Sequence, residues 1–138
     1  MSNKVIEVTA GVIFDRQRRL LATERPAGKA LAGKWEFPGG KLEKNENAVQ
    51  ALIRELDEEL SLRVTPLDEM YRLSVVAPDG NTLILHFLRA LILDGCEPLP
   101  RENQQYCWVE TSQLAELDWL DTDREFVEYL AMAYGRKI

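Results

Sequence analysis

The chain has 138 residues, 46% of them hydrophobic, which is enough for one domain with a sizeable core. Its formal net charge of −6 argues against a nucleic-acid polymer or an anionic membrane as partner, because both are bound by basic surfaces. No apolar run approaches the roughly 20 residues of a membrane helix and the N-terminus has no signal-peptide core, so we expect one cytoplasmic domain over residues 1–138.

The N-terminal third reads as strands and a loop. Val5–Phe14 and Leu20–Thr23 are β-rich, and the charged turn between them predicts a hairpin. The segment from Arg25 to Lys34 contains a proline and two glycines and is expected to be a loop. A short strand over Trp35–Phe37 should follow and stop at Pro38.

A helix is predicted over residues 48–60, because Asn47 followed by Gln50 is a capping-box pattern. Five apolar residues fall on one narrow stripe of this helix, which we expect to face the core. They are Val49, Leu52, Ile53, Leu56 and Leu60.

Carboxylates occupy a second face of the same helix. Glu55, Glu58 and Glu59 are spaced i, i+3, i+4, and their small neighbours Ala48 and Ala51 would leave room for a ligand. Like charges at this spacing repel by a few tenths of a kcal/mol per pair, and a bound cation would remove that cost. Oxygen ligands suit hard ions such as Mg²⁺. The alternative is a solvated acidic helix face.

The remaining elements are strands followed by helices. Asp68–Ala77 and Thr82–Leu93 flank a turn and predict a second hairpin. After a polar loop over 94–104, Gln105–Val109 is strand-like, and Ser112–Leu117 is expected to be a short helix.

A last helix over 123–134 is predicted by the capping box of Thr122 and Glu125, with Gly135 as its C′ residue. Strands interrupted by one helix and closed by another indicate an α/β protein with a mixed sheet between helices. Cys96 and Cys107 lack metal-ligand spacing and are expected to be reduced thiols.

The spacing around the glutamates is specific. Gly40, five residues, Glu46, seven residues and then Arg54-Glu55-Leu56-Asp57-Glu58-Glu59-Leu60-Ser61-Leu62 resembles the Nudix box, Gly-x5-Glu-x7-Arg-Glu-U-x-Glu-Glu-x-Gly-U with U aliphatic. Eight of the nine specified positions agree. The departure is Ser61, where the family has glycine, so the exit turn of the helix is expected to differ.

The resemblance implies a Nudix-type α/β/α sandwich and metal-assisted attack of water on a nucleoside diphosphate linked to another moiety. It implies Mg²⁺, with Mn²⁺ as a substitute, held by the Gly39 carbonyl and by Glu55, Glu58 and Glu59. Glu46 and Arg54 are expected to be structural, pairing with each other or orienting the glutamates.

The run Trp35–Lys41 resembles the MutT-type subgroup of nucleoside triphosphate pyrophosphohydrolases. That resemblance implies that Arg25 contacts nucleotide phosphate. It also implies that Glu102, six residues before Trp108, is a further metal ligand or helps to activate the water. Lys41 is a candidate phosphate contact. For all three, the alternative is a solvated loop residue.

Asp123 lies where members of the subgroup that act on oxidised guanine carry an asparagine. An ionised aspartate only accepts hydrogen bonds, and the helix N-terminus should disfavour its protonation. We therefore expect cytosine or modified-adenine triphosphates to be preferred over 8-oxo-guanine triphosphate. The alternative is that Asp123 serves only the helix dipole.

The function expected is Mg²⁺-dependent hydrolysis of nucleoside or deoxynucleoside triphosphates, modified and oxidised ones included, by a monomer or homodimer. One alternative is a Nudix hydrolase of ADP-ribose or a dinucleoside polyphosphate, and another is a catalytically silent nucleotide-binding module. His86, Trp108 and Trp119 are expected to be packing residues.

Overall fold

The computed structural model describes residues 3–134, whose strands form one mixed sheet in the order β3-β2-β1-β6-β5, with β4 paired to β1 and β7 paired to β2. β1 and β6 are parallel, whereas the other paired strands are antiparallel. The elements are β1 (Val5–Phe14), β2 (Leu20–Glu24), β3 (Trp35–Glu36), β4 (Gly39–Lys41), α1 (Ala48–Leu60), β5 (Val64–Val76), β6 (Thr82–Ile92), β7 (Gln105–Val109), the 3₁₀ helix η1 (Thr111–Glu116) and α2 (Asp121–Tyr134).

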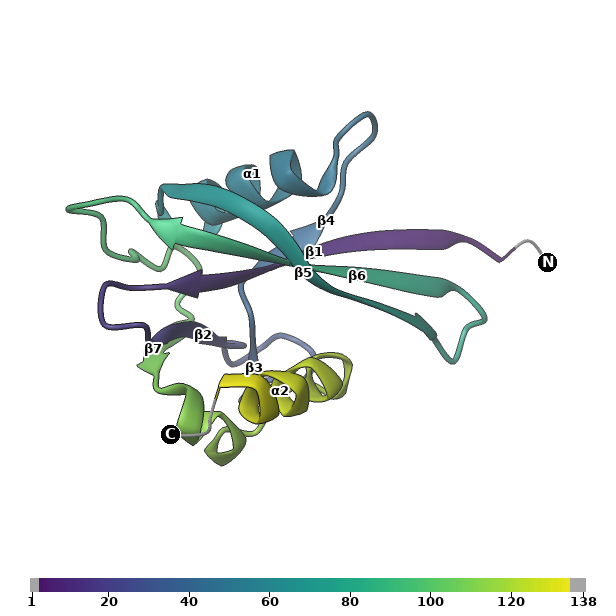
Figure 1. Ribbon diagram of the computed structural model, residues 1–138. Helices are drawn as coiled ribbons and strands as arrows, with labels where there is room; N and C mark the ends of the chain where they lie inside the picture. Colours follow the sequence, from purple (N-terminus) through teal and green to yellow (C-terminus); the bar gives the residue numbers. More distant parts are fainter. Residues whose placement is uncertain (1–2, 135–138) are drawn as a thin grey trace.

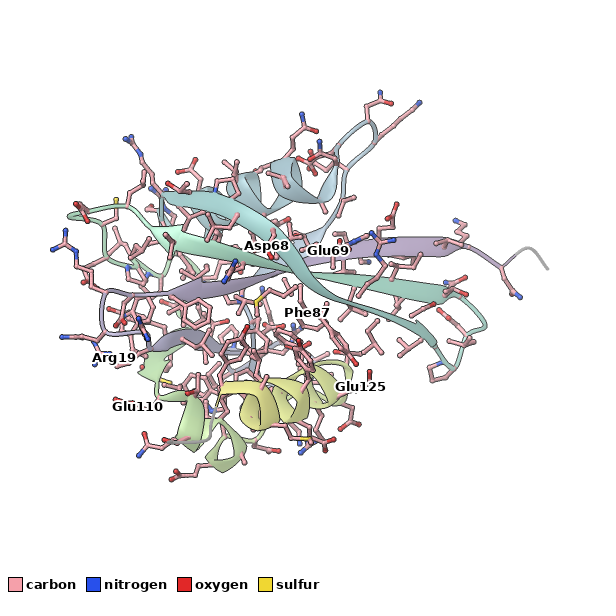
Figure 2. The ribbon with its side chains drawn as sticks, in the orientation of Figure 1. Arg19, Asp68, Glu69, Phe87, Glu110 and Glu125 are labelled. Carbon is pink, nitrogen blue, oxygen red and sulfur yellow. The ribbon has the colours of Figure 1, made fainter. Side chains whose placement is uncertain are left out.

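The two α-helices cover opposite faces of the sheet (Figure 1). Alternate residues of β1 point to the two sides, as the pleat of a strand requires. Val12 packs in the cluster beneath α2, together with Phe87 of β6 and Phe126 of the helix, whereas Ile13 packs beneath α1 with Leu52. Figure 2 shows Phe87 between the sheet and α2. The α/β class, the mixed sheet and the two hairpins are confirmed.

The capping box that opens α1 is present, since Gln50 N donates to Asn47 Oδ1 at 2.8 Å and Asn47 N donates to Gln50 Oε1 at 2.9 Å. The predicted apolar stripe is partly wrong. Leu52, Leu56 and Leu60 are fully buried and Ala51 is buried with them, but Val49 and Ile53 are 39% and 46% exposed.

α1 is therefore rotated relative to the prediction, so that Glu55 and Glu59 are partly buried whereas Glu58 remains exposed to solvent. Close packing over Gly11 fixes this orientation, because a Cβ there would lie 3.0 Å from a methyl carbon of Leu52. Ala51 is completely buried, so it does not leave the open space expected beside the glutamates. The room for a ligand lies instead at the C-terminal end of the helix.

Two strands differ from the prediction. β5 begins at Val64, before the expected Asp68, and its pairing with β6 shifts register around Glu69. Such β-bulges interrupt the alternation of apolar and polar residues by which a strand is recognised. β4 is a strand that the sequence did not predict, because glycine has a low strand propensity; Thr9 of β1 pairs with Gly40 there.

The C-terminal elements are close to those expected. The short helix is the 3₁₀ helix η1. α2 begins at Asp121, so Thr122 lies inside the helix instead of capping it, and Gly135 lies outside the described residues. Cys96 and Cys107 are free thiols. No helix among residues 3–134 combines the length and the apolar character needed to cross a membrane.

Candidate active site

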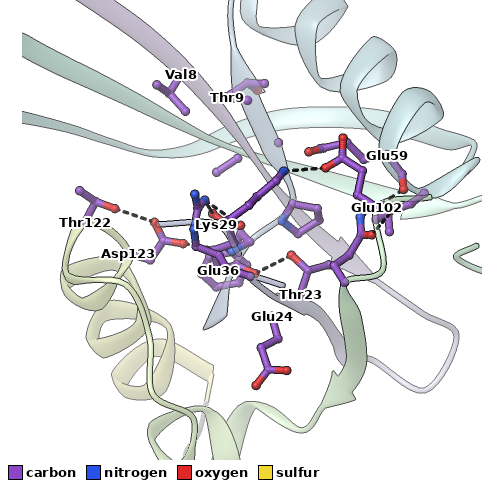
Figure 3. A pocket seen from close by; sticks show the side chains of 18 of the residues that line it. Val8, Thr9, Thr23, Glu24, Lys29, Glu36, Glu59, Glu102, Thr122 and Asp123 are labelled. Atoms are coloured by element: carbon purple, nitrogen blue, oxygen red, sulfur yellow. Dashed lines mark hydrogen bonds and ion pairs between the residues drawn. The ribbon is translucent and has the colours of Figure 1, made fainter. Parts of the chain in front are cut away.

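A cavity of about 240 Å³ opens where the C-terminal end of α1, the start of α2 and the loops over 25–34 and 94–104 meet the sheet (Figure 3). Six of the expected site residues line it although they come from distant parts of the sequence. They are Arg25, Gly39, Lys41, Glu59, Glu102 and Asp123.

Glu55 and Glu58 do not line this cavity but adjoin it. The Glu55 carboxylate lies against Gly40, where a Cβ would come within 2.5 Å of the carboxylate carbon. Arg54 Nη1 donates to Glu55 at 2.9 Å and to Glu58 at 3.3 Å. Glu58 is more exposed, with 59% of its side chain accessible against 17% for Glu55. The three glutamates therefore differ in environment, and Arg54 links two of them.

Arg54 has the structural role that the sequence predicted. Its Nε and Nη2 donate to the Glu46 carboxylate at 2.8 Å and 2.9 Å, and Nη2 also donates to the Lys41 carbonyl at 3.1 Å. The Arg54 hydrogen bonds lower the pKa of Glu46 to about 2. This fork fastens the loop that precedes α1 to the helix and so fixes β4 beside the glutamates.

Glu59 carries the clearest electrostatic signature in the site. Burial, which is the largest cause, and the neighbouring carboxylates of Glu55, Glu102 and Glu36 together raise the pKa of Glu59 to about 8. Carboxylates crowded without a compensating cation disfavour ionisation. The donor set is therefore short of positive charge.

The residues present fit a hard divalent cation. All the candidate donors are oxygen atoms, as such an ion prefers. The Thr9 hydroxyl is buried at the cavity without a hydrogen-bond partner among the described residues, and a hydrated ion would offer it one. A Cβ on Gly39 would lie 1.9 Å from the Thr9 carbonyl oxygen, so only glycine brings its backbone this close. Within residues 3–134, no three His, Cys, Asp or Glu side chains already converge as metal ligands.

Glu102 lies in a loop that is anchored to α1 by backbone hydrogen bonds. Leu99 N donates to the Leu60 carbonyl at 2.7 Å, and Arg101 N donates to the Glu59 carbonyl at 3.0 Å. These bonds satisfy carbonyl groups that the end of a helix leaves free. The Glu102 carboxylate itself accepts a hydrogen bond from Lys29 Nζ at 2.8 Å.

Arg25 organises its own loop as well as lining the cavity. Its Nε donates to the Ala30 carbonyl at 2.8 Å, and its Nη1 lies 3.4 Å from both oxygens of Glu36. Burial raises the pKa of Glu36, and Arg25 opposes that rise. Part of the hydrogen-bonding capacity of the Arg25 guanidinium is thus used by the Ala30 carbonyl and by Glu36.

Asp123 is only 4% exposed and accepts a hydrogen bond from Phe37 N at 3.0 Å. Burial raises the pKa of Asp123 to about 7, and it outweighs the bond from Phe37, which acts in the opposite direction. A pKa of about 7 means that the helix N-terminus does not by itself keep this carboxyl fully ionised near neutral pH. Desolvation of a nearly enclosed carboxylate exceeds the effect of the helix dipole.

Thr9, Lys29 and Glu36 are among the cavity-lining residues that sequence reasoning missed. Nothing in the local sequence marks Lys29, which reaches Glu102 across 73 positions. His86 lies outside the cavity, buried between Glu7 and Glu69 at 2.8 Å and 2.5 Å.

Trp119 is a core residue as expected. It is 1% exposed and stacks on Phe37 with ring centroids 4.7 Å apart.

The geometry, with a carboxylate-bearing helix against a glycine strand, matches one known family. A model of the NUDIX domain matches residues 6–130. The chain belongs to the Nudix family.

Two relatives and one solved structure are similar to this chain within the family. The chain is 36% identical over 115 residues to an 8-oxo-dGTP diphosphatase of Haemophilus influenzae, covering 83% of this chain and 82% of the relative. It is 50% identical over 62 residues to a CTP pyrophosphohydrolase of Escherichia coli, covering 45% of each. The solution structure of the E. coli ORF135 protein superposes with a TM-score of 0.79 at 31% identity, covering 97% of this chain and 94% of that one.

Proposed function

We propose that this Nudix protein hydrolyses nucleoside or deoxynucleoside triphosphates, modified and oxidised forms included, to the nucleoside monophosphate and pyrophosphate. The observation that carries this is the cavity itself, which is lined by the acidic side chains of Glu59 and Glu102 together with the basic side chains of Arg25 and Lys29. A cavity lined by both kinds of charge suits a polyphosphate that carries its own cation. The names of the two relatives, which describe diphosphatase and pyrophosphohydrolase activity on nucleotides, support the same reaction.

Nudix hydrolases generally use a divalent metal, and we propose Mg²⁺ here, with Mn²⁺ as a substitute. The residues that would hold it are Glu55, Glu58, Glu59, Glu102 and the carbonyl of Gly39. When bound, such an ion neutralises phosphate oxygens and lowers the pKa of a bound water.

The chain's own residues would position substrate and water. Phosphoryl transfer needs the phosphates held in line with the attacking water and their charge balanced. Arg25 and Lys41 would contact phosphate oxygens, since both line the cavity. Either Glu55 or Glu102 would accept the proton that the attacking water loses while its oxygen bonds to phosphorus and the anhydride bond breaks.

The buried Asp123 would read the base. Its carboxyl is enclosed at the cavity wall beside Phe37, as a selective contact requires. A protonated carboxyl donates one hydrogen bond, whereas an ionised one only accepts. We propose that the ionised form favours cytosine or adenine, whose amino groups donate, and that the protonated form tolerates the O6 acceptor of 8-oxo-guanine.

A screen that separates and quantifies all phosphate-containing products by anion-exchange chromatography tests the reaction. Modified and unmodified triphosphates, ADP-ribose and a dinucleoside polyphosphate are each incubated with the protein, with Mg²⁺ or with EDTA. We expect nucleoside monophosphate and pyrophosphate from triphosphates only when the metal is present, and at least ~10²-fold less of both from the Glu59→Gln variant. Hydrolysis of ADP-ribose or the dinucleotide in preference to every triphosphate, or no hydrolysis at all, would overturn the proposal.

A further inference from the structure

A salt bridge closes one side of the cavity. Lys29, in the loop over 25–34, places its Nζ 2.8 Å from Glu102 Oε2, in the loop over 94–104 (Figure 3). The two side chains are 48% and 45% exposed, so water reaches both. Each loop is anchored elsewhere, one by Arg25 and the other by Arg101. The pair therefore joins two fixed loops through two movable side chains.

Lys29 is the mobile cation of this wall. Arg25 is held by the Ala30 carbonyl and by Glu36. Lysine carries a compact charge on a flexible stem, and half-exposed ion pairs are weakly held.

Lys29 balances one of two carboxylates that line the same cavity. Glu59 and Glu102 are these two residues, and Lys29 Nζ lies 2.8 Å from the Glu102 carboxylate. Lys29 therefore takes the place that a bound cation would take beside Glu102. The same contact occupies the Glu102 oxygen that a metal would need.

We propose that Lys29 has two positions: it pairs with Glu102 in the free protein, and it moves to the polyphosphate when nucleotide and metal bind, which releases Glu102 to the metal. This inference rests on the proposed function. It makes Lys29 both a phosphate contact and a positioning residue for Glu102. Two opposite effects follow, because Lys29 competes with metal in the absence of nucleotide and assists nucleotide binding in its presence.

A double-mutant cycle on metal affinity tests the first effect without any nucleotide. Isothermal titration with Mg²⁺ alone is compared for the wild type, Lys29→Met, Glu102→Gln and the double variant. We expect Lys29→Met to bind Mg²⁺ about two- to fivefold more tightly than the wild type, as loss of an exposed ion pair permits. In the Glu102→Gln background the same change should have no effect, because its partner is already gone.

The second effect is measured with an α,β-methylene nucleoside triphosphate in the presence of Mg²⁺. Lys29→Met should bind it about tenfold more weakly, since a charge-assisted contact to phosphate is lost. Lys29→Arg should retain most of the affinity. Lys34→Met is the matched control, because Lys34 ends the same loop and pairs with Asp118 at 2.9 Å but does not line the cavity. It should change neither affinity.

The inference is overturned if Lys29→Met leaves Mg²⁺ affinity unchanged or reduced, or if it raises that affinity equally in the Glu102→Gln background. Unchanged binding of the analogue by Lys29→Met would also overturn it. These outcomes are separable from failure of the proposed function. A wild-type protein that releases pyrophosphate from triphosphates but shows no coupling in the cycle retains the function and loses the inference. A wild-type protein that shows coupling between Lys29 and Glu102 in the cycle but hydrolyses no triphosphate retains the inference about Mg²⁺ binding and loses the proposed function.

Discussion

Replacing Glu59 by glutamine should make the metal-free protein more stable at high pH while abolishing most of its activity. The pKa of Glu59 is raised to about 8 in the folded protein by burial and by neighbouring carboxylates. In the unfolded chain this carboxyl titrates near its ordinary value of 4.5. Between these values the folded protein holds a proton that the unfolded chain releases, so stability falls as pH rises. Glutamine does not ionise and removes that fall.

The size of the effect follows from the difference between the folded and unfolded pKa of Glu59. Each pKa unit corresponds to about 1.4 kcal/mol of unfolding free energy, but water reaches part of the Glu59 side chain and screens its charge. We therefore expect Glu59→Gln to be more stable than the wild type by about 2 kcal/mol at pH 9. For a chain of this length that corresponds to about 8 °C in Tm. At pH 5 the wild-type carboxyl is neutral, and the two proteins should unfold at nearly the same temperature.

The assay is thermal unfolding in EDTA from pH 5 to pH 9, compared between the wild type and Glu59→Gln. Asp123 acts with the same sign, because its pKa is also raised, so both proteins are measured in an Asp123→Asn background as well. Added Mg²⁺ should stabilise the wild type at pH 9 more than the variant. Turnover of Glu59→Gln should be at least ~10²-fold lower. Parallel pH profiles for the two proteins would refute the electrostatic reading of Glu59.

The other predictions concern single side chains. Glu58→Gln should lower turnover at least ~10²-fold without loss of stability, because Glu58 is largely exposed and only its proposed metal contact is removed. Thermal unfolding followed by circular dichroism should be unchanged, and unchanged turnover would contradict the metal contact. For Asp123, the ratio of kcat/KM for a cytosine or modified-adenine triphosphate over 8-oxo-guanine triphosphate should rise with pH through about 7, where its pKa lies. Asp123→Asn should flatten that profile, and a tenfold preference for the oxidised guanine at every pH would be incompatible with the proposed role. Ser61 has a φ of 47° and accepts a hydrogen bond from Arg101, so Ser61→Gly should be about 1 kcal/mol more stable to urea than Ser61→Ala, since both lose the bond and only glycine relaxes the left-handed backbone. His86→Phe should lower the urea midpoint of unfolding, because the buried ring lies within hydrogen-bond distance of both Glu7 and Glu69 and phenylalanine leaves these contacts unmade. Its turnover should be unchanged, since His86 does not line the cavity, and an unchanged midpoint would argue against the double contact.

Local patterns predicted local structure well. The bounds of α1 followed from Asn47 and Gln50, because a capping box acts within one turn of helix. The fork between Arg54 and Glu46 followed from the spacing of the box. In both cases the interacting groups lie within eight residues of each other, so the sequence itself brings them together.

What the sequence could not predict depends on tertiary contacts. β4 exists because β1 accepts it as a neighbour, and the glycines of β4 have no strand preference of their own. The orientation of α1 depends on the space above Gly11. Asp123 was judged from its place on a helix, yet its protonation is governed by burial that no local pattern reports. The contact between Lys29 and Glu102 could not be predicted, because the two residues lie in different loops 73 positions apart and neither is part of a recognisable motif.

The parallel pairing of β1 with β6 affects the order in which parts of the protein can fold while the chain is being synthesised. Val5 lies opposite Thr82, and Phe37 N is bonded to Asp123 across 86 positions. Contacts this distant in sequence form slowly, since a large loop must close before they are gained. A nascent chain that has emerged only to residue 100 contains the whole Nudix box but neither Glu102 nor Asp123. The cavity is therefore complete only after α2 has been synthesised, and a nucleotide that binds in it would stabilise the finished fold but none of the earlier stages of folding.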